Sequence, residues 1–283
     1  MKSSTGLKVS IVVIVLVIIG ALALIFSSPT ANNSSKIGKG TTTASTSSGR
    51  TAAPASVVSN LSGVSMSTLD AIGVGTANAK PKTIKAPALT NNGKPEVFYE
   101  GAEFCPYCAT ERWAMGVALS KFGTFKNLGL THSSSTDVYP NTQTLSFYQS
   151  TYSSPYISFV PLEIYSNVPS GNAYGTLQTP TTAENNLVNK YDSPPYVSAS
   201  QAQSIPFIDF GGKFLSVGAT YSPTVLQGKS AESIAGSLSD ATNPIAMGAD
   251  GSANLMIASI CKLTNNKPTT VCDATIQKIE KGL

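Results

Sequence analysis

The sequence predicts an α/β domain that follows a single N-terminal transmembrane helix. Three observations lead to this fold class. An uncharged apolar segment opens the chain, a short β-branched and aromatic run passes directly into helical spacing at two cysteines, and two later apolar runs are joined by a Gly-Gly turn. A change between the strand and helix periods is typical of α/β domains. We therefore expect a sheet with an inserted segment and a helical C-terminal extension.

The composition is that of a chain with a folded core. It has 283 residues, 41% hydrophobic and 12% charged, with a mean hydropathy of +0.07, which excludes a collagen-like or wholly disordered chain. Residues 1–85 hold eight Lys or Arg and one acid, so the formal charge of +4 leaves −3 on residues 86–283. A mildly acidic domain argues against nucleic-acid binding. The single histidine, His132, excludes a multi-histidine metal site.

The apolar segment from Val9 to Phe26 predicts a membrane anchor. As a helix it would span about 27 Å, close to the thickness of the hydrocarbon core. The alternative is a cleaved signal peptide, although Ser27-Ser28-Pro29 is a poor cleavage site. Residues 1–8 carry Lys2 and Lys8, which favours a cytoplasmic tail and places the domain on the extracytoplasmic side of the cell membrane.

Residues 27–90 are rich in Ser, Thr, Asn, Gly and Ala, and they predict a disordered linker. Three Asn-x-Ser triplets start at Asn32, Asn33 and Asn60; they are either glycosylation sites or chance products of a Ser-rich stretch. Residues 57–72 have a loose amphipathic spacing, but Gly63 within them and Gly73 and Gly75 after them argue against a stable helix. The folded domain is expected over residues 91–283.

The most informative motif is Cys105-Pro106-Tyr107-Cys108. The apolar run from Val97 to Tyr99 before it predicts a strand, and helical spacing follows it up to Gly123. The motif therefore lies where a strand passes into a helix. A thiol at a helix N-terminus is favoured as thiolate, and Pro106 suits the first helical turn, where its missing N–H costs nothing.

This position predicts two roles. Cys105 would be the attacking thiolate, and Cys108, one turn into the helix, the resolving thiol that releases a mixed disulfide. The alternatives are a structural disulfide or half of a zinc site. Zinc needs a second close pair of ligands, whereas Cys261 and Cys272 lie far downstream with ten residues between them.

A second segment, from Ser204 to Ala219, predicts two strands joined at Gly211-Gly212, with Pro206 at the entrance of the first. The two segments together resemble thioredoxin-fold proteins: residues 102–108 look like the active-site turn of that superfamily, and Pro106-Tyr107 is the dipeptide of glutaredoxins. The resemblance implies a cis Ile205–Pro206 bond beside Cys105, with Ile205, Pro206, Pro106 and Tyr107 contacting the substrate. An ordinary strand-start proline is the alternative.

The chain departs from plain thioredoxins at Tyr99, which stands where they carry a buried aspartate that deprotonates the second cysteine. That role is either unfilled or passes to Glu100 or Glu103. The long interval after Cys108, the extra cysteines and the anchor resemble the archaeal membrane-anchored family called domain of unknown function 929. This resemblance covers about residues 90–283, and it implies a thioredoxin-like sheet.

The interval between the two segments predicts strands at Leu128–His132 and at Ile157–Tyr165; Pro161 makes the second an edge strand or one with a bulge. Tyrosines are frequent in its polar stretches, where they either form a binding surface or are simply exposed.

The tail has helical spacing at residues 230–238, 253–263 and 271–279. Cys261 and Cys272 flank an Asn-Asn-Lys-Pro turn, which predicts a disulfide that clasps two helices. A second redox pair that relays electrons to Cys105 and Cys108 is the alternative.

These observations predict a membrane-anchored, extracytoplasmic thiol-disulfide oxidoreductase that acts on protein substrates. It needs no bound cofactor, and it could exchange electrons with a membrane redox partner. The alternative is an anchored binding or scaffold module of the same fold in which the Cys105–Cys108 bond is inert.

Overall fold

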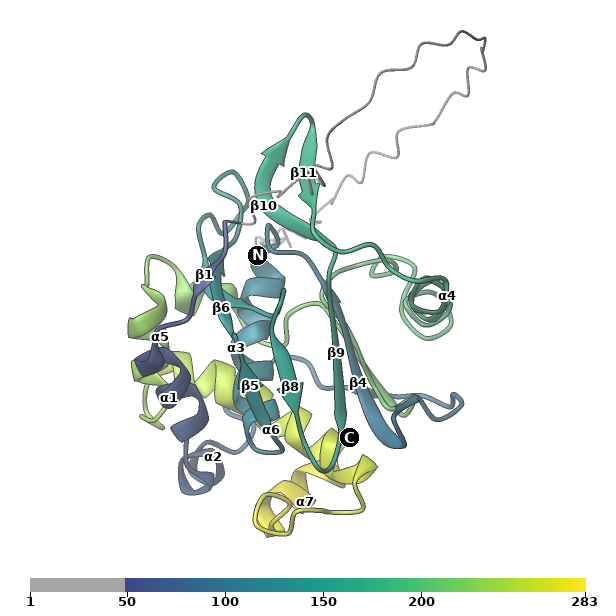
Figure 1. Ribbon diagram of the computed structural model, residues 1–283. Coiled ribbons are helices and arrows are strands. Elements are labelled where there is room, and N and C mark those ends of the chain that lie inside the picture. The colour runs from purple at the N-terminus through teal and green to yellow at the C-terminus, as the bar shows by residue number, and fades with distance from the viewer. Residues whose placement is uncertain (1–48) are drawn as a thin grey trace, which may run out of the picture. The chain divides into compact units, whose positions relative to one another are not determined.

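The computed structural model describes residues 49–283 (Figure 1). This part of the chain is a mixed α/β structure with several sheets and seven α-helices. The predicted cytoplasmic tail, the predicted anchor and residues 27–48 of the predicted linker lie outside the described residues. None of the helices between residues 49 and 283 is both long and apolar enough to cross a membrane.

The central sheet is built around β4 (Lys94–Gly101), the strand that leads into the cysteine motif. It pairs antiparallel with β12 on one side and parallel with β9, and β12 continues into β13 and then β2. The other members are β2 (Lys82–Thr83), β3 (Thr90–Asn91), which pairs with the start of β4, β9 (Ser158–Glu163), β12 (Phe207–Phe210) and β13 (Phe214–Val217). The predicted Gly-Gly hairpin joins β12 to β13, and both Gly211 and Gly212 have positive φ.

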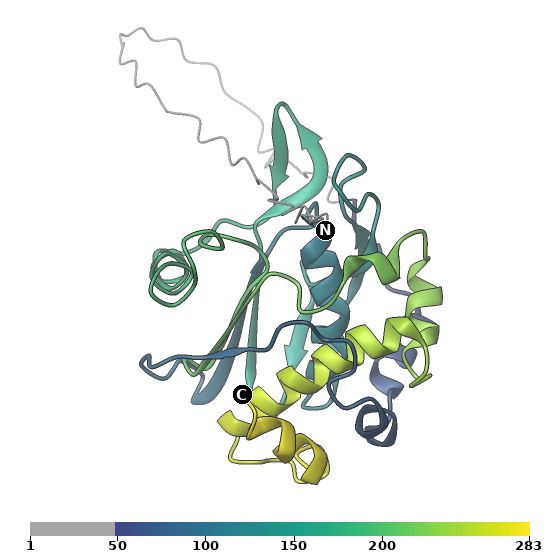
Figure 2. The ribbon, with the colours of Figure 1, turned by 180° about the vertical axis from the view of Figure 1, so that it is seen from behind.

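Side chains of β4 alternate between two hydrophobic clusters, because successive residues of a strand point to opposite faces. Val97 and Tyr99 pack in the larger cluster with α3 (Pro106–Ser120) and α6 (Pro244–Leu263). Phe98 packs in the smaller cluster with Val188 of α4 (Thr182–Tyr191). The sheet is therefore covered by α3 and α6 on one face and by α4 on the other, as Figures 1 and 2 show.

The inserted segment adds short antiparallel strands, of which β5 and β7 contact α3. The predicted strand at 128–132 is β6, and the one at 157–165 covers β9 and the first residue of β10. Pro161 lies inside β9, which pairs only with β4 among the described strands, so it is at an edge as expected. The remaining bounds are β1 (Thr51–Ala52), β5 (Thr124–Lys126), β6 (Gly129–His132), β7 (Gln143–Ser146), β8 (Thr151–Ser153), β10 (Tyr165–Ser170) and β11 (Ala173–Thr176).

The prediction of a disordered linker over residues 27–90 is wrong for its described part, residues 49–90. Residues there form α1 (Ala55–Gly63) and α2 (Met66–Ile72), besides the short strands β1, β2 and β3. Val57, Leu61 and Leu69 are buried in the larger cluster. The Ser- and Gly-rich sequence has weak helix propensity, but burial of these few apolar side chains against the domain outweighs it.

The C-terminal part contains the three predicted helices, with one longer than expected. They are α5 (Ala231–Ser237), α6 (Pro244–Leu263) and α7 (Ala274–Glu280), preceded by a 3-10 turn, η1 (Pro223–Leu226). Helix α6 begins nine residues before the predicted Ala253, because the Asn243 side chain caps it and Pro244 opens it. Cys261 and Cys272 form a disulfide with their Cα atoms 5.6 Å apart, between α6 and α7.

Candidate functional site

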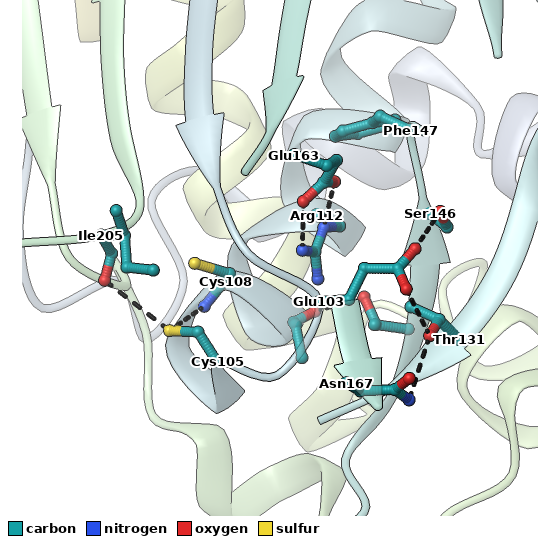
Figure 3. A network of polar contacts seen from close by, with 12 residues as sticks. Glu103, Cys105, Cys108, Arg112, Thr131, Ser146, Phe147, Glu163, Asn167 and Ile205 are labelled. Carbon is teal, nitrogen blue, oxygen red and sulfur yellow. Dashed lines mark hydrogen bonds and ion pairs between the residues drawn. The ribbon is translucent and has the colours of Figure 1, made fainter. Parts of the chain in front are cut away.

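Cys105 and Cys108 meet at the N-terminus of α3, directly after β4 (Figure 3). Cys105 is the N-cap residue, and the backbone N–H of Cys108 donates to its sulfur at 3.3 Å. Both thiols are free, and Cys105 is 5% exposed whereas Cys108 is fully buried. The two cysteines therefore lie in reach of each other, and Cys105 is the more accessible.

The two thiols have opposite tendencies to ionise. Burial opposes ionisation of Cys105, but hydrogen bonds from the Cys108 thiol and from the N–H groups of Cys108 and Tyr107, together with the charge of Arg112, outweigh it and lower its pKa. Burial, and then the interaction with the Cys105 sulfur, raises the pKa of Cys108 well above its usual value. Cys105 is thus the thiol that ionises first, which fits an attacking role.

The loop before β12 brings a second segment to Cys105. The Ile205–Pro206 bond is cis, and the Cys105 thiol lies 3.8 Å from the carbonyl oxygen of Ile205 (Figure 3). The Pro206 carbonyl accepts from the backbone N–H of Gly218 at 2.8 Å, which ties this loop to the end of β13. The segments that resemble a thioredoxin active site thus lie side by side, although a hundred residues separate them in the chain.

The other two predicted substrate contacts lie in the first turn of α3. Pro106 is buried, while Tyr107 is 36% exposed and its ring meets that of Tyr139 edge to face at 6.0 Å. Phe104, before Cys105, stacks on Tyr174 of β11 with ring centroids 4.4 Å apart. Tyr139 and Tyr174 of the insert therefore pack against residues on either side of Cys105.

A buried ion pair that the sequence analysis missed lies behind the thiols. Arg112 donates from Nε to one carboxylate oxygen of Glu163 at 2.8 Å and from Nη2 to the other at 2.6 Å. Both side chains are fully buried. The guanidinium carbon also lies 5.9 Å from the centroid of the Tyr99 ring. The spacing of Cys108 and Arg112, one helical turn apart, was visible in the sequence, but the partner strand was not.

Neither carboxylate considered as a base for Cys108 makes a described hydrogen bond to it. Glu103 is fully buried and accepts from Ser146 at 2.6 Å and from Thr131 at 3.3 Å (Figure 3). Burial, and less strongly the charge of Glu163, raises its pKa to about 7. Glu100 lies on the α4 side, in the wall of a cavity of about 410 Å³ that Tyr165 and Gln203 also line.

The ionisable groups that do interact with the Cys108 sulfur are Cys105, Arg112 and Tyr99. Tyr99 occupies the strand position at which the sequence analysis noted a tyrosine in place of a buried aspartate. Burial raises the pKa of Tyr99 well above its usual value. Among these groups, the one that favours the Cys108 thiolate is therefore a cation, Arg112, and not a base.

The disulfide between Cys261 and Cys272 lies away from this site. The end of α6 and α7 are at the opposite end of the domain from the start of α3, in both views (Figures 1 and 2). Both sulfurs are bonded to each other and buried in the larger cluster. This placement favours the structural interpretation of the pair over the electron relay.

Metal ligation has no obvious centre in this part of the chain. Between residues 49 and 283 no group of three or more His, Cys, Asp or Glu side chains is arranged to hold a metal ion.

Comparison with known proteins gives one match. No curated protein and no solved structure matches the chain. The family model described as "Domain of unknown function (DUF929)" matches residues 80–262, which include β4, the cysteine motif, the Ile205–Pro206 loop and all but the last residue of α6. The matched segment covers well over half of the chain, and the chain belongs to the DUF929 family.

Proposed function

We propose that this protein is a membrane-anchored, extracytoplasmic thiol-disulfide oxidoreductase that acts on protein substrates through Cys105 and Cys108. One observation carries the proposal: the Cys105 sulfur caps α3 and accepts the Cys108 N–H at 3.3 Å, beside the carbonyl of Ile205. Unpaired N–H groups and the helix dipole favour a thiolate at that point.

A thioredoxin-like arrangement is part of the proposal. Four strands of the central sheet have the order β13–β12–β4–β9, with β4 and β9 parallel and the other pairs antiparallel. The cysteine motif follows the central strand, and the proline loop precedes the antiparallel hairpin. This order supports the resemblance of the two motifs to thioredoxin-fold proteins.

The proposed reaction starts from the free thiols. The Cys105 thiolate attacks one sulfur of a substrate disulfide; that S–S bond breaks, a Cys105–substrate disulfide forms, and the second substrate sulfur leaves as a thiolate. Cys108 then loses its proton and attacks the Cys105 sulfur, forming the Cys105–Cys108 bond and releasing the first substrate thiolate. Two electrons pass from the protein to the substrate, and the reverse sequence oxidises a substrate dithiol.

The compartment is supported by two features. Residues 9–26 form the apolar segment expected to anchor the chain. The disulfide between Cys261 and Cys272 is of the kind that persists outside the cytoplasm. A membrane protein that regenerates the active cysteine pair is the expected redox partner, and exchange requires no bound cofactor.

Single cysteine variants test the roles. Cys105→Ser is expected to abolish exchange with a disulfide-bonded peptide, while Cys108→Ser accumulates mixed disulfides, visible as adducts on non-reducing gels. The double variant Cys261→Ser/Cys272→Ser serves as the control and retains exchange. Adducts trapped on Cys108 in the Cys105→Ser variant would reverse the assignment.

The low exposure of Cys105, only 5%, favours a second candidate: an anchored scaffold module in which the cysteine pair is inert. Alkylation by iodoacetamide at pH 5–6 separates the two. An activated thiolate reacts in this range, whereas an ordinary thiol is almost fully protonated. A Cys105 that reacts no faster than a cysteine in a short peptide would favour the scaffold.

A further inference from the structure

We propose that Arg112, held by Glu163, is a positioning residue that sets the reactivity of the Cys105–Cys108 pair. The inference rests on the proposed exchange function and deepens it. In this inference the buried ion pair controls how readily the two thiols ionise. Among the described residues, no carboxylate forms a hydrogen bond with Cys108.

The geometry of α3 places Arg112 behind the second thiol. Cys108 and Arg112 are four positions apart in one helix, so their side chains leave the same face one turn apart. Both residues are fully buried, which keeps water from screening the charge. The guanidinium acts on both sulfurs, where it favours the thiolate form.

The pairing with Glu163 leaves one donor of the guanidinium free. Nε and Nη2 each bond a carboxylate oxygen, whereas Nη1 has no hydrogen-bond partner among residues 49–283. The hydroxyl of Tyr99, whose ring centroid lies 5.9 Å from the guanidinium carbon, is also without a hydrogen-bond partner in that part of the chain. A buried N–H left unpaired is costly, and a thiolate formed one turn away would offset part of that cost.

Glu163 holds the cation and also limits its effect. The carboxylate is on β9, paired to the strand that precedes the motif, and its own backbone N–H donates to Gln178 at 2.8 Å. Arg112 acts directly on both thiols, while Glu163 acts on Arg112, Tyr99 and Glu103. The cation is thus the charge that faces the sulfurs, and the carboxylate partly compensates it.

If the ion pair only stabilised the fold, removing either partner would have the same kind of effect on Cys105. If Arg112 tunes the thiols, the two substitutions change the stability of the Cys105 thiolate in opposite directions. Arg112→Met removes the positive charge, and the isolated Glu163 then takes up a proton, as buried carboxyls do. The Cys105 thiolate loses support. Glu163→Gln leaves Arg112 charged and uncompensated, so the same thiolate gains support. Both variants break one pair, yet they act on the thiol in opposite directions.

The experiment measures the pH at which Cys105 becomes half-reactive. The full-length chain, with Cys105 and Cys108 reduced and the Cys261–Cys272 bond intact, is alkylated with iodoacetamide between pH 4 and 10, and peptide mass spectrometry follows Cys105 alone. A neighbouring charge in a buried site shifts the midpoint by about one pH unit. We expect it to rise in Arg112→Met and to fall in Glu163→Gln.

Two further variants keep the test decisive if Arg112→Met or Glu163→Gln destabilises the fold. Arg112→Lys retains the charge but not the two-pronged pairing, and its midpoint should stay nearer to wild type than that of Arg112→Met. Glu111→Gln is the matched control: Glu111 is the preceding residue of α3, is equally buried, and among residues 49–283 its carboxylate accepts hydrogen bonds only from the N–H and hydroxyl of Thr220. It should lower stability without moving the midpoint.

The outcomes separate this inference from the proposed function. Midpoints that move in the same direction in Arg112→Met and Glu163→Gln, or that match Glu111→Gln, would overturn the role of Arg112 while leaving the exchange function intact. A wild-type midpoint near that of an ordinary thiol would instead contradict the exchange function itself.

Discussion

Cys105 and Cys108 differ in chemistry because α3 gives each a different set of neighbours. Cys105 is outside the first turn, where N–H groups point at its sulfur. Cys108 is inside the helix and fully buried, so its thiolate forms only when Cys105 no longer carries the negative charge. The order of ionisation matches the order of attack in the proposed exchange, since the resolving thiol must not compete for the substrate.

Asp250 shows how burial of a single carboxyl shapes pH dependence. It is fully buried in α6, and neither of its oxygens has a hydrogen-bond partner among residues 49–283. Burial raises its pKa from 3.8 to about 8, and the charge of Lys121 opposes this only in part. The folded state holds this proton more tightly than the unfolded state does. The contribution of the carboxyl to the free energy of unfolding is therefore full below about pH 4 and is lost as the pH rises through about 8.

Asp250→Asn should therefore flatten the fall in stability between pH 5 and pH 9. The effect is on the order of 1.4 kcal/mol per unit of pKa difference, with several kcal/mol as the upper bound. Urea unfolding at both pH values measures it, and Asp137→Asn, at a side chain that is only partly buried, is the control. If the free energy of unfolding fell equally between pH 5 and pH 9 in wild type and in Asp250→Asn, Asp250 would not be buried as a neutral acid.

Among the elements, the junction of β4 and α3 could be predicted because local sequence determines it. The strand run, the glycine that ends it, the N-cap cysteine and Pro106 all point to one structure, so that no distant contact is needed. The hairpin at Gly211-Gly212 has the same property. By contrast, Arg112 finds its partner 51 residues away on β9, and no local pattern announces that pairing.

Distant contacts, and not local sequence, determine three other helical segments, which could not be predicted. They are α1, α2 and the first half of α6. Gly248, Gly251 and Asn254 weaken the helical pattern of α6, yet each serves a close contact. A Cβ on Gly248 would lie 2.6 Å from the Tyr221 ring, and the Asn254 amide donates to the carbonyls of Leu69 and Gly73 in α2 and its cap. Residues that disfavour a helix by their sequence alone are here the positions at which α6 packs closely against neighbouring elements.

The clasp between α6 and α7 gives a prediction at this scale. Replacing both Cys261 and Cys272 with Ser frees a loop whose ends are 11 residues apart, which costs roughly 3 kcal/mol in the chain-entropy model. The melting temperature should fall by about 6–10 °C, while Cys105 keeps its alkylation rate. Calorimetry measures the first and mass spectrometry the second. Loss of Cys105 reactivity in a stable variant would support the electron relay instead.

The described part of the molecule depends on its first segment as well as on its sheet. Residues 49–90 contribute α1 and α2 to the larger hydrophobic cluster, where Leu61 and Leu69 meet side chains of α3 and α6. The cap of α2 is held by Asn254, and the turn after it lies against the middle of α6. This segment, which the composition alone assigns to a linker, is therefore expected to unfold together with the domain that carries the cysteines.

A pair of glycine substitutions tests that cooperativity. A Cβ on Gly251 would lie 2.5 Å from the backbone oxygen of Val74, a contact that only a shift of the turn or of α6 relieves. Gly251→Ala should therefore destabilise the domain by about 1–3 kcal/mol. Gly63, at the end of α1, has no atom within 4 Å of such a Cβ, and Gly63→Ala should be neutral or stabilise by up to about 1 kcal/mol. Urea unfolding, followed by the fluorescence of Trp113 in α3, measures both. A Gly251→Ala midpoint equal to that of wild type would mean that residues 73–75 do not pack on α6, and that the first segment is not part of the folding unit.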